Sequence, residues 1–275
     1  MSRFIVVAPG SSEAAVLATD DLARVLGVTT VDALAGTTAT DAALRPASAL
    51  PAAVEAVRAA GEDALIAPAR EASNRAFDHV AWNLNLAAST RAGVVLALDA
   101  EGASAELLTE EITAARLRAE AAAASVVAVI LTGGTPSLEV DVPVLTLPLG
   151  DEAAAATLRA AATPTAVTPL AFQADLIERA RADRKRIVLP EPDDDRVLQA
   201  AAQVLAAGIA DITFVGDADY VAKRAGELGL DLSNAQVVSV NDPAYLERYA
   251  EEFARLRAKK GVTLEQAREK VTDVS

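Results

Sequence analysis

Short apolar runs alternate with helix-type patterns along almost the whole chain, and this alternation restricts the fold more than any other feature. The pattern predicts strands at residues 4–8, 64–68, 91–100, 125–134 and 142–148, and helices at residues 13–26, 50–60 and 104–124. Strands separated by helices are typical of a parallel sheet with helical crossovers. The sequence therefore predicts an α/β fold, with a doubly wound, mostly parallel sheet in its N-terminal part.

The alternation is interrupted at ATPTAVTPLAF, residues 162–172, where Pro164 and Pro169 break both patterns. We interpret this segment as an interdomain connection. A charged helix is predicted at residues 175–186, followed by strands at 186–190, 211–216 and 236–240 and by helices at 194–207, 218–228, 243–260 and 263–272. The predicted organisation is a domain at residues 1–161, a linker at 162–174, and the incomplete beginning of a second α/β domain at 175–275.

Composition excludes several classes of site. The 275 residues include no cysteine, so disulfides and thiolate metal sites are excluded. His79 is the single histidine, which leaves almost no residues from which a zinc site or a Ser-His-Asp triad could be built. A net charge of −14 argues against nucleic acid as a partner. There is no apolar stretch of about 18 residues, and the short N-terminal apolar run is read as a strand. We expect a cytoplasmic protein that binds neither nucleic acid nor membranes.

The first βα loop, APGSSEAAV at residues 8–16, lies where many α/β proteins bind phosphate. A P-loop needs G-x-x-x-x-G-K-[ST], and this loop has one glycine and no lysine. We predict a P-loop-like fold without a P-loop, with Ser11 or Ser12 capping the following helix. The segment GGTP at residues 133–136 is only a turn signal at the edge where α/β ligands bind, and His79 is interpreted as a structural side chain.

Three consecutive acids, Asp193 to Asp195, stand between the strand at 186–190 and the next helix. Carboxylates at this point accept hydrogen bonds from free N–H groups and complement the positive end of the helix. They also repel a phosphate from the same place. We interpret the three aspartates as a helix start, with the anion site elsewhere.

The segment RLRAKKG, residues 255–261, gathers four cations with no acid between them: Arg255, Arg257, Lys259 and Lys260. Cations near a helix C-terminus are favourable, and this accounts for one or two of the four. Arg257 and Lys260, three residues apart, share a helix face and are suited to binding phosphates. From spacing alone, two interpretations of this cluster stay open: electrostatic capping of the helix end and binding of a phosphate group.

Six segments of residues 175–275 form a pattern that can be compared with known families: KRIVLPE, DDR, AGIADITFVG, LGLDL, RLRAKKG and VTLEQAR. In this order they resemble the opening of the catalytic domain of phosphate acetyltransferases. More faintly, LNLAASTRAGVVLALDA and VVAVILTGG in the N-terminal 160 residues are similar to the dethiobiotin-synthetase-like domain that precedes the catalytic domain in longer members.

The resemblance implies a reaction in which acetyl-CoA and phosphate exchange with acetyl phosphate and CoA. The CoA thiolate attacks the acetyl carbon directly, with an aspartate as base and a serine and arginines stabilising charge, and no metal or other cofactor is implied. The family's E-L-R arginine lies near the CoA and phosphate site and corresponds to Arg257, with Lys260 as a second candidate. The chain departs from the pattern at Arg255, Ala258 and Lys259. A homo-oligomer is implied for the full-length form.

Two family segments, V-S-G-A and S-T-K-G-S, are absent from this sequence, and with them the catalytic serine, the base and a further arginine. We therefore predict a truncated phosphate acetyltransferase with no catalytic residue in this chain, which alone does not turn over. One alternative is a related butyryltransferase or other acyltransferase. The other is a non-catalytic fragment that senses a metabolite or mediates oligomerisation. A P-loop ATPase is the least favoured alternative, because the P-loop lysine is absent.

Overall fold

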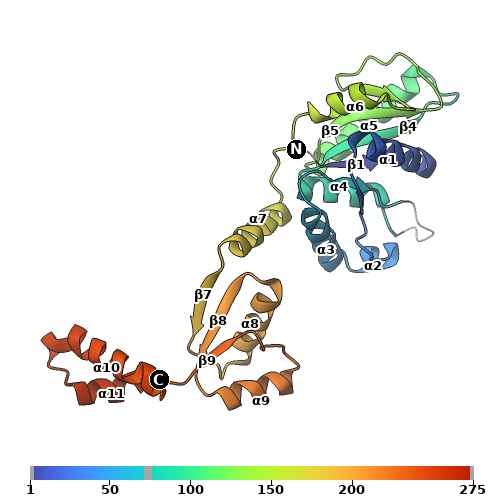
Figure 1. Cartoon of the computed structure of the whole chain (residues 1–275). Helices are drawn as coiled ribbons and strands as arrows, with labels where there is room; N and C mark the ends of the chain where they lie inside the picture. Colours follow the sequence, from blue (N-terminus) through green and yellow to red (C-terminus); the bar gives the residue numbers. More distant parts are fainter. Residues whose placement is uncertain (1–2, 71–75, 273–275) are drawn as a thin grey trace. The chain divides into compact units, whose positions relative to one another are not determined.

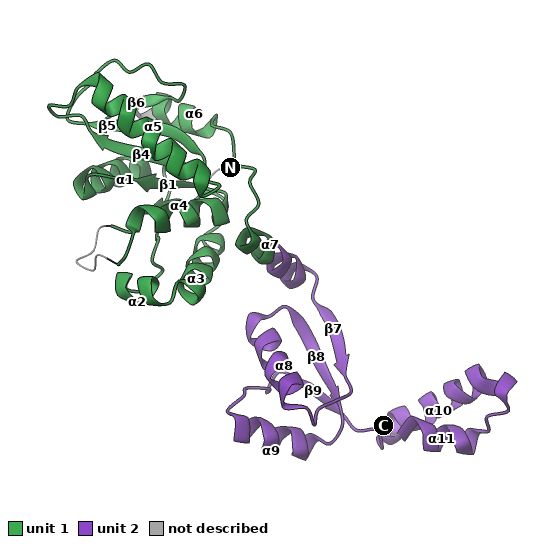
Figure 2. Ribbon diagram, turned by 180° about the vertical axis from the view of Figure 1, so that it is seen from behind, with its two compact units in different colours: residues 1–174 green, residues 175–275 purple. Residues whose placement is uncertain are grey.

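The computed structural model describes residues 3–70 and 76–272, and the chain divides into two compact units. Unit 1 comprises residues 1–174 and unit 2 residues 175–275, with the boundary inside helix α7 (Pro169–Ala182) (Figure 2). No helix in these described ranges is both long and apolar enough to cross a membrane.

Unit 1 is built on a parallel sheet of six strands in the order β2-β3-β1-β4-β5-β6. Figure 1 labels β1, β4 and β5 of this sheet. Its strands are β1 (Phe4–Val7), β2 (Thr30–Asp32), β3 (Leu65–Ala67), β4 (Gly93–Asp99), β5 (Val126–Thr132) and β6 (Val144–Thr146). Its helices are α1 (Ser12–Leu26), α2 (Ala39–Leu44), α3 (Pro46–Ala59), α4 (His79–Thr90), α5 (Ala105–Ala121) and α6 (Asp151–Arg159). This is the predicted doubly wound α/β architecture.

Helices cover both faces of this sheet. On one face, Val6 and Ile130 pack with Leu22 of α1 and Leu158 of α6. On the other face, strand residues such as Leu96 pack with α3, α4 and α5. Parallel sheets are normally buried on both faces, so the strands are continuous apolar runs rather than alternating ones.

Unit 2 is built on a three-stranded parallel sheet in the order β7-β8-β9. The strands are β7 (Lys185–Leu189), β8 (Ala210–Val215) and β9 (Gln236–Val238), and helices α8 (Asp195–Ala207) and α9 (Ala218–Leu228) follow β7 and β8. Ile212 and Phe214 of β8 pack with Leu198 of α8 and Val221 of α9. The core of unit 2 therefore lies on one face of its sheet.

The other face of this sheet carries the alternate strand positions, including Val188, which is 56% exposed. A hollow of about 260 Å³ separates it from α10 (Pro243–Arg257) and α11 (Leu264–Thr272). These two helices pack on each other through the buried Ala250 and Ala267, and Arg268 forms an ion pair with Glu247 at 2.8 Å.

Several element boundaries differ from the predictions. Helix α7 begins at Pro169 rather than at residue 175, because proline is well suited to a first helical position and the Thr168 hydroxyl accepts a hydrogen bond from the N–H of Ala171. The helix predicted at 243–260 ends at Arg257 and continues as the single 3₁₀ turn η1 (Ala258–Lys260). Strand β2 and helices α2, α4 and α6 were not predicted at all.

Candidate functional site

The predicted anion-binding residues lie where α10 ends. Arg257 is the last residue of α10, Lys260 closes the 3₁₀ turn η1, and Gly261 follows in the left-handed region with φ of 74°. Residues three apart in a 3₁₀ turn lie one above the other. The backbone therefore brings Arg257 and Lys260 to the same side of this helix end, which is the shared face predicted from their spacing.

The four cations of this segment, which we call the basic end of α10 (Arg255, Arg257, Lys259 and Lys260), are not equivalent. Arg255 pairs with Glu252, with Nη2 at 2.6 Å and Nε at 2.7 Å from its carboxylate oxygens. This hydrogen-bonded pair lowers the pKa of Glu252 and raises that of Arg255. The charge of Arg255 is thus already compensated within the helix.

The other three cations, Arg257, Lys259 and Lys260, are exposed, and none has a hydrogen bond or ion pair to another described residue. The guanidinium carbon of Arg257 lies 5.8 Å from the centroid of the Phe253 ring, within the range of a cation–π contact. This contact leaves the N–H groups of Arg257 available. The side chains therefore do not act as hydrogen-bonding caps, and the three positive charges have no acidic partner among the described residues.

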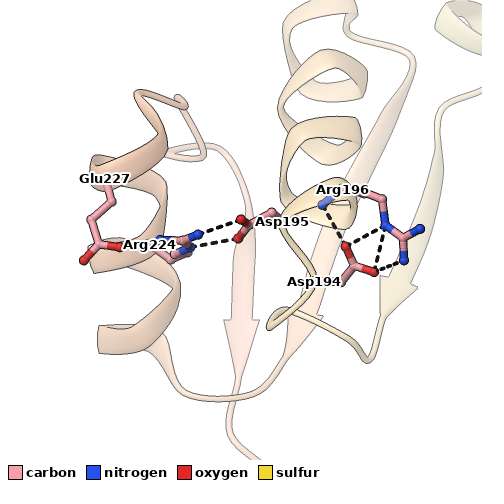
Figure 3. A network of polar contacts seen from close by, with 5 residues as sticks. All are labelled: Asp194, Asp195, Arg196, Arg224 and Glu227. Atoms are coloured by element: carbon pink, nitrogen blue, oxygen red, sulfur yellow. Dashed lines mark hydrogen bonds and ion pairs between the residues drawn. The ribbon is translucent and has the colours of Figure 1, made fainter.

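Asp194 and Asp195 form the start of α8, as predicted (Figure 3), whereas Asp193 lies in the turn before the N-cap. Asp194 is the N-cap residue and accepts a hydrogen bond from the backbone N–H of Arg196 at 2.8 Å. The Arg196 side chain also donates a hydrogen bond to the same carboxylate, from Nη2 to Oδ2 at 2.6 Å. These hydrogen bonds lower the pKa of Asp194 to about 2, so this carboxylate is ionised and unsuited to general acid–base work near neutral pH.

Asp195 has a partner that the sequence did not reveal. Arg224 of α9 donates two hydrogen bonds to its carboxylate, at 2.8 and 2.6 Å, and a third to Glu227 at 2.7 Å (Figure 3). The bonds from Arg224 lower the pKa of Asp195, and the two acids raise that of Arg224. The three side chains line an open hollow of about 650 Å³. Their charges compensate one another, which favours a structural link between α8 and α9 over catalysis.

The candidate features of unit 1 lie at two helix starts and in the loop after β5. Ser11 caps α1 by accepting a hydrogen bond from the N–H of Ala14 at 3.2 Å, which confirms the capping prediction for Ser11. His79 is the first residue of α4 and half-buried. Gly133 of the GGTP segment has φ of 71° and lies in a bend directly after β5. Within the described ranges, no group of three His, Asp or Glu side chains is placed to hold a metal ion.

The fold and this geometry describe a two-unit α/β protein with available cations at a helix end in its second unit. Residues 171–275 match the model of the phosphate acetyl/butaryl transferase family. The resemblance to phosphate acetyltransferases is thereby confirmed for the C-terminal part of the chain, which contains the basic end of α10 and the three aspartates.

Phosphate acetyltransferases from two bacteria show the extent of this similarity. The chain is 49% identical to that of Corynebacterium glutamicum over 104 residues, which are 38% of this chain and 32% of the relative. It is 41% identical to that of Nitratidesulfovibrio vulgaris over 107 residues, 39% of this chain and 15% of the relative. The matched region therefore spans a third or less of the length of these relatives.

Among solved structures, a phosphotransacetylase from Streptococcus pyogenes matches with 27% identity and a TM-score of 0.36, covering 39% of this chain and 32% of that one. The EutD phosphotransacetylase from Staphylococcus aureus matches with 33% identity and a TM-score of 0.32, covering 37% and 32%.

Proposed function

We propose that this chain carries part of the machinery of a phosphate acetyltransferase, which exchanges acetyl-CoA and phosphate with acetyl phosphate and CoA. The observation that supports the proposal most strongly is the 49% identity over 104 residues to a phosphate acetyltransferase. The proposal includes small-molecule substrates only, no metal or further cofactor, a cytoplasmic location and a homo-oligomer in the full-length form.

In this proposal Arg257 and Lys260 hold the anionic groups of the substrates. CoA, phosphate and acetyl phosphate all present phosphate oxygens, which the planar fork of Arg257 can bind in pairs and which the point charge of Lys260 can attract. The contact of Arg257 with Phe253 restricts the guanidinium before the substrate arrives. No carboxylate of the described residues competes for it. Both residues are thus substrate-binding rather than proton-transferring.

The chemical step is direct attack of the CoA thiolate on the acetyl carbon, with no covalent acyl-enzyme. It needs a base for the thiol proton and donors for the charge that develops on the carbonyl oxygen. Asp194 and Asp195 are occupied by arginines and do not supply the base. We therefore propose that the base and the serine lie outside these 275 residues, and that this chain alone does not turn over.

The matching family covers both acetyl and butaryl transferases, so a butyryl group is the second candidate for the transferred acyl group. Substrate profiling with acetyl and butyryl phosphate separates the two, and we propose acetyl because the relatives reported above are phosphate acetyltransferases.

A chimera tests the role of Arg257. Residues 171–275 replace the matching segment of the Corynebacterium glutamicum enzyme, and acetyl-CoA formation from acetyl phosphate and CoA is followed. We expect the chimera to turn over and Arg257→Gln to lower kcat/KM at least about tenfold, the effect of losing one charge-assisted contact.

The matched control is Arg255→Gln, two residues away on the same helix and already paired with Glu252. We expect it to change kcat/KM by less than about twofold, since exposed ion pairs of this kind contribute little. Equal losses in the two variants would show that only general positive charge matters. An unchanged kcat/KM in Arg257→Gln would remove Arg257 from the substrate site.

A further inference from the structure

Unit 1 contains a hollow of about 550 Å³. It lies beyond the carboxyl ends of β2 and β3 and beside α1, which is the edge of an open α/β sheet where ligands bind. Its lining combines the apolar side chains of Val16, Leu34 and Pro68 with three charged ones, Asp20, Asp32 and Arg70.

The two loops that form this hollow are held by neighbouring side chains of α4. The indole N–H of Trp82 donates to the carbonyl of Ala33, in the loop after β2, at 3.0 Å. Asn83 accepts from the N–H of Ala69 at 2.9 Å and donates to its carbonyl at 2.8 Å, in the loop after β3. Both side chains are buried, so these bonds are costly to break. The hollow is therefore preformed, as ligand pockets usually are.

The charged groups of the hollow are available for a ligand. Asp32 accepts from the N–H groups of Leu34 and Gly36, which fixes its carboxylate but does not neutralise it. Asp20 and Arg70 have no hydrogen bond or ion pair to any residue in the described ranges. Arg70 thus lines the same hollow as two carboxylates without pairing with either of them.

This combination restricts the ligand. A purely anionic compound would meet two carboxylates, and a purely cationic one would leave Arg70 uncompensated. A compound with one positive and one negative group, joined to an apolar body, complements all three charges and the apolar lining. We propose that the hollow binds an apolar amino acid, with its ammonium group at Asp20 and Asp32, its carboxylate at Arg70 and its side chain against Val16, Leu34 and Pro68.

Calorimetric titration of the 275-residue chain tests the ligand class. Five apolar amino acids are titrated one by one: valine, leucine, isoleucine, methionine and phenylalanine. The amino acid that binds most tightly is then compared with two of its analogues, the amide and the deaminated acid. We expect each analogue, which lacks one charge, to bind at least about tenfold more weakly. Equal binding of either analogue overturns the proposal. So does the absence of binding by all five amino acids at millimolar concentration, or binding of adenosine monophosphate in their place.

Two variants test which charged side chain of the hollow contacts the carboxylate of the amino acid and which contacts its ammonium group. Arg70→Gln should weaken the amino acid about tenfold and leave the amide, which has no carboxylate, unchanged. Asp20→Asn should weaken both the amino acid and the amide. Glu110→Gln, an exposed acid of α5 outside the hollow, is the matched control and should change neither. Unchanged binding of the amino acid in Arg70→Gln overturns the assignment, and coincident thermal unfolding of the variants shows that they remain folded.

Discussion

The sheets of the two units are both parallel, but they are covered differently. In unit 1 helices pack on both faces, and Val95 in the middle of β4 is fully buried. In unit 2 helices α8 and α9 pack on one face, and Val188 of β7 is 56% exposed. Parallel strands are normally buried on both sides. The comparison indicates that the sheet of unit 1 lies between two apolar layers, whereas the sheet of unit 2 packs its core on one face.

The same contrast appears in the polar side chains. The buried Trp82 and Asn83 of unit 1 hold loops from inside the fold. In unit 2 the best-defined polar contacts are ion pairs at the surface, such as Asp195 with Arg224 and Glu247 with Arg268. Exposed ion pairs of this kind contribute little to stability. Unit 2 therefore relies more on its few large apolar side chains.

The largest expected effect is at the centre of the core of unit 2. Phe214 of β8 is fully buried, and Phe214→Ala should lower the free energy of unfolding of unit 2 by about 3–5 kcal/mol. The measurement is urea unfolding with hydrogen exchange resolved by unit. Leu256→Ala, which truncates a 64% exposed side chain on α10 of the same unit, is the control and should cost less than about 0.5 kcal/mol. Similar costs for the two variants would contradict a single-faced core at Phe214.

A pair of identical substitutions compares the two sheets directly. Val95→Ala in β4 should cost about 1.5–3 kcal/mol, because it removes two buried methyl groups at about 0.8 kcal/mol each and leaves a cavity, and Val188→Ala in β7 less than about 0.5 kcal/mol. Both are measured as the free energy of unfolding of the unit concerned. A cost at Val188 close to that at Val95 would show that the outer face of the unit 2 sheet is covered in solution.

A smaller effect is expected from acid. The folded pKa of Asp194 is about 2, below the ordinary value of about 3.9 in an unfolded chain. A lowered folded pKa stabilises the folded state above the unfolded pKa, and this contribution is lost as the pH falls from about 4 toward 2. Unit 2 should therefore unfold at lower urea concentration at pH 3 than at pH 6.

Arg196→Gln tests the cause of this pH dependence, because the side chain of Arg196 is the largest influence on the pKa of Asp194. The variant should lose less stability than the unaltered chain between pH 6 and pH 3. An identical loss would show that other carboxylates, such as Asp195 and Glu247, account for the acid sensitivity.

Much of the fold could be predicted because long apolar runs such as β4 and β5 have few alternatives to a buried parallel strand. Strand β2 was missed because it has three residues, two of them exposed, which is too short for any periodicity. Helix α6 was missed because it is only nine residues long and its buried face is formed largely by the small side chains of Ala154 and Ala155 beside Leu158.

The candidate site was predictable only in part. The basic end of α10 is a local cluster in the sequence, and family resemblance singled out Arg257 within it. The pairing of Asp195 with Arg224 joins residues 29 positions apart on different helices, which no local pattern shows. The hollow beside α1 likewise depends on how the loops after β2 and β3 are held by α4.

The most direct test of the proposed function is CoA-dependent formation of acetyl-CoA from acetyl phosphate, measured for the 275-residue chain beside the chimera with the Corynebacterium glutamicum enzyme. We predict turnover by the chimera and none by the chain alone, because the base and the serine are proposed to lie outside its residues. Turnover by the chain alone would mean that a complete active site exists within these 275 residues. That result would contradict our placement of the catalytic groups.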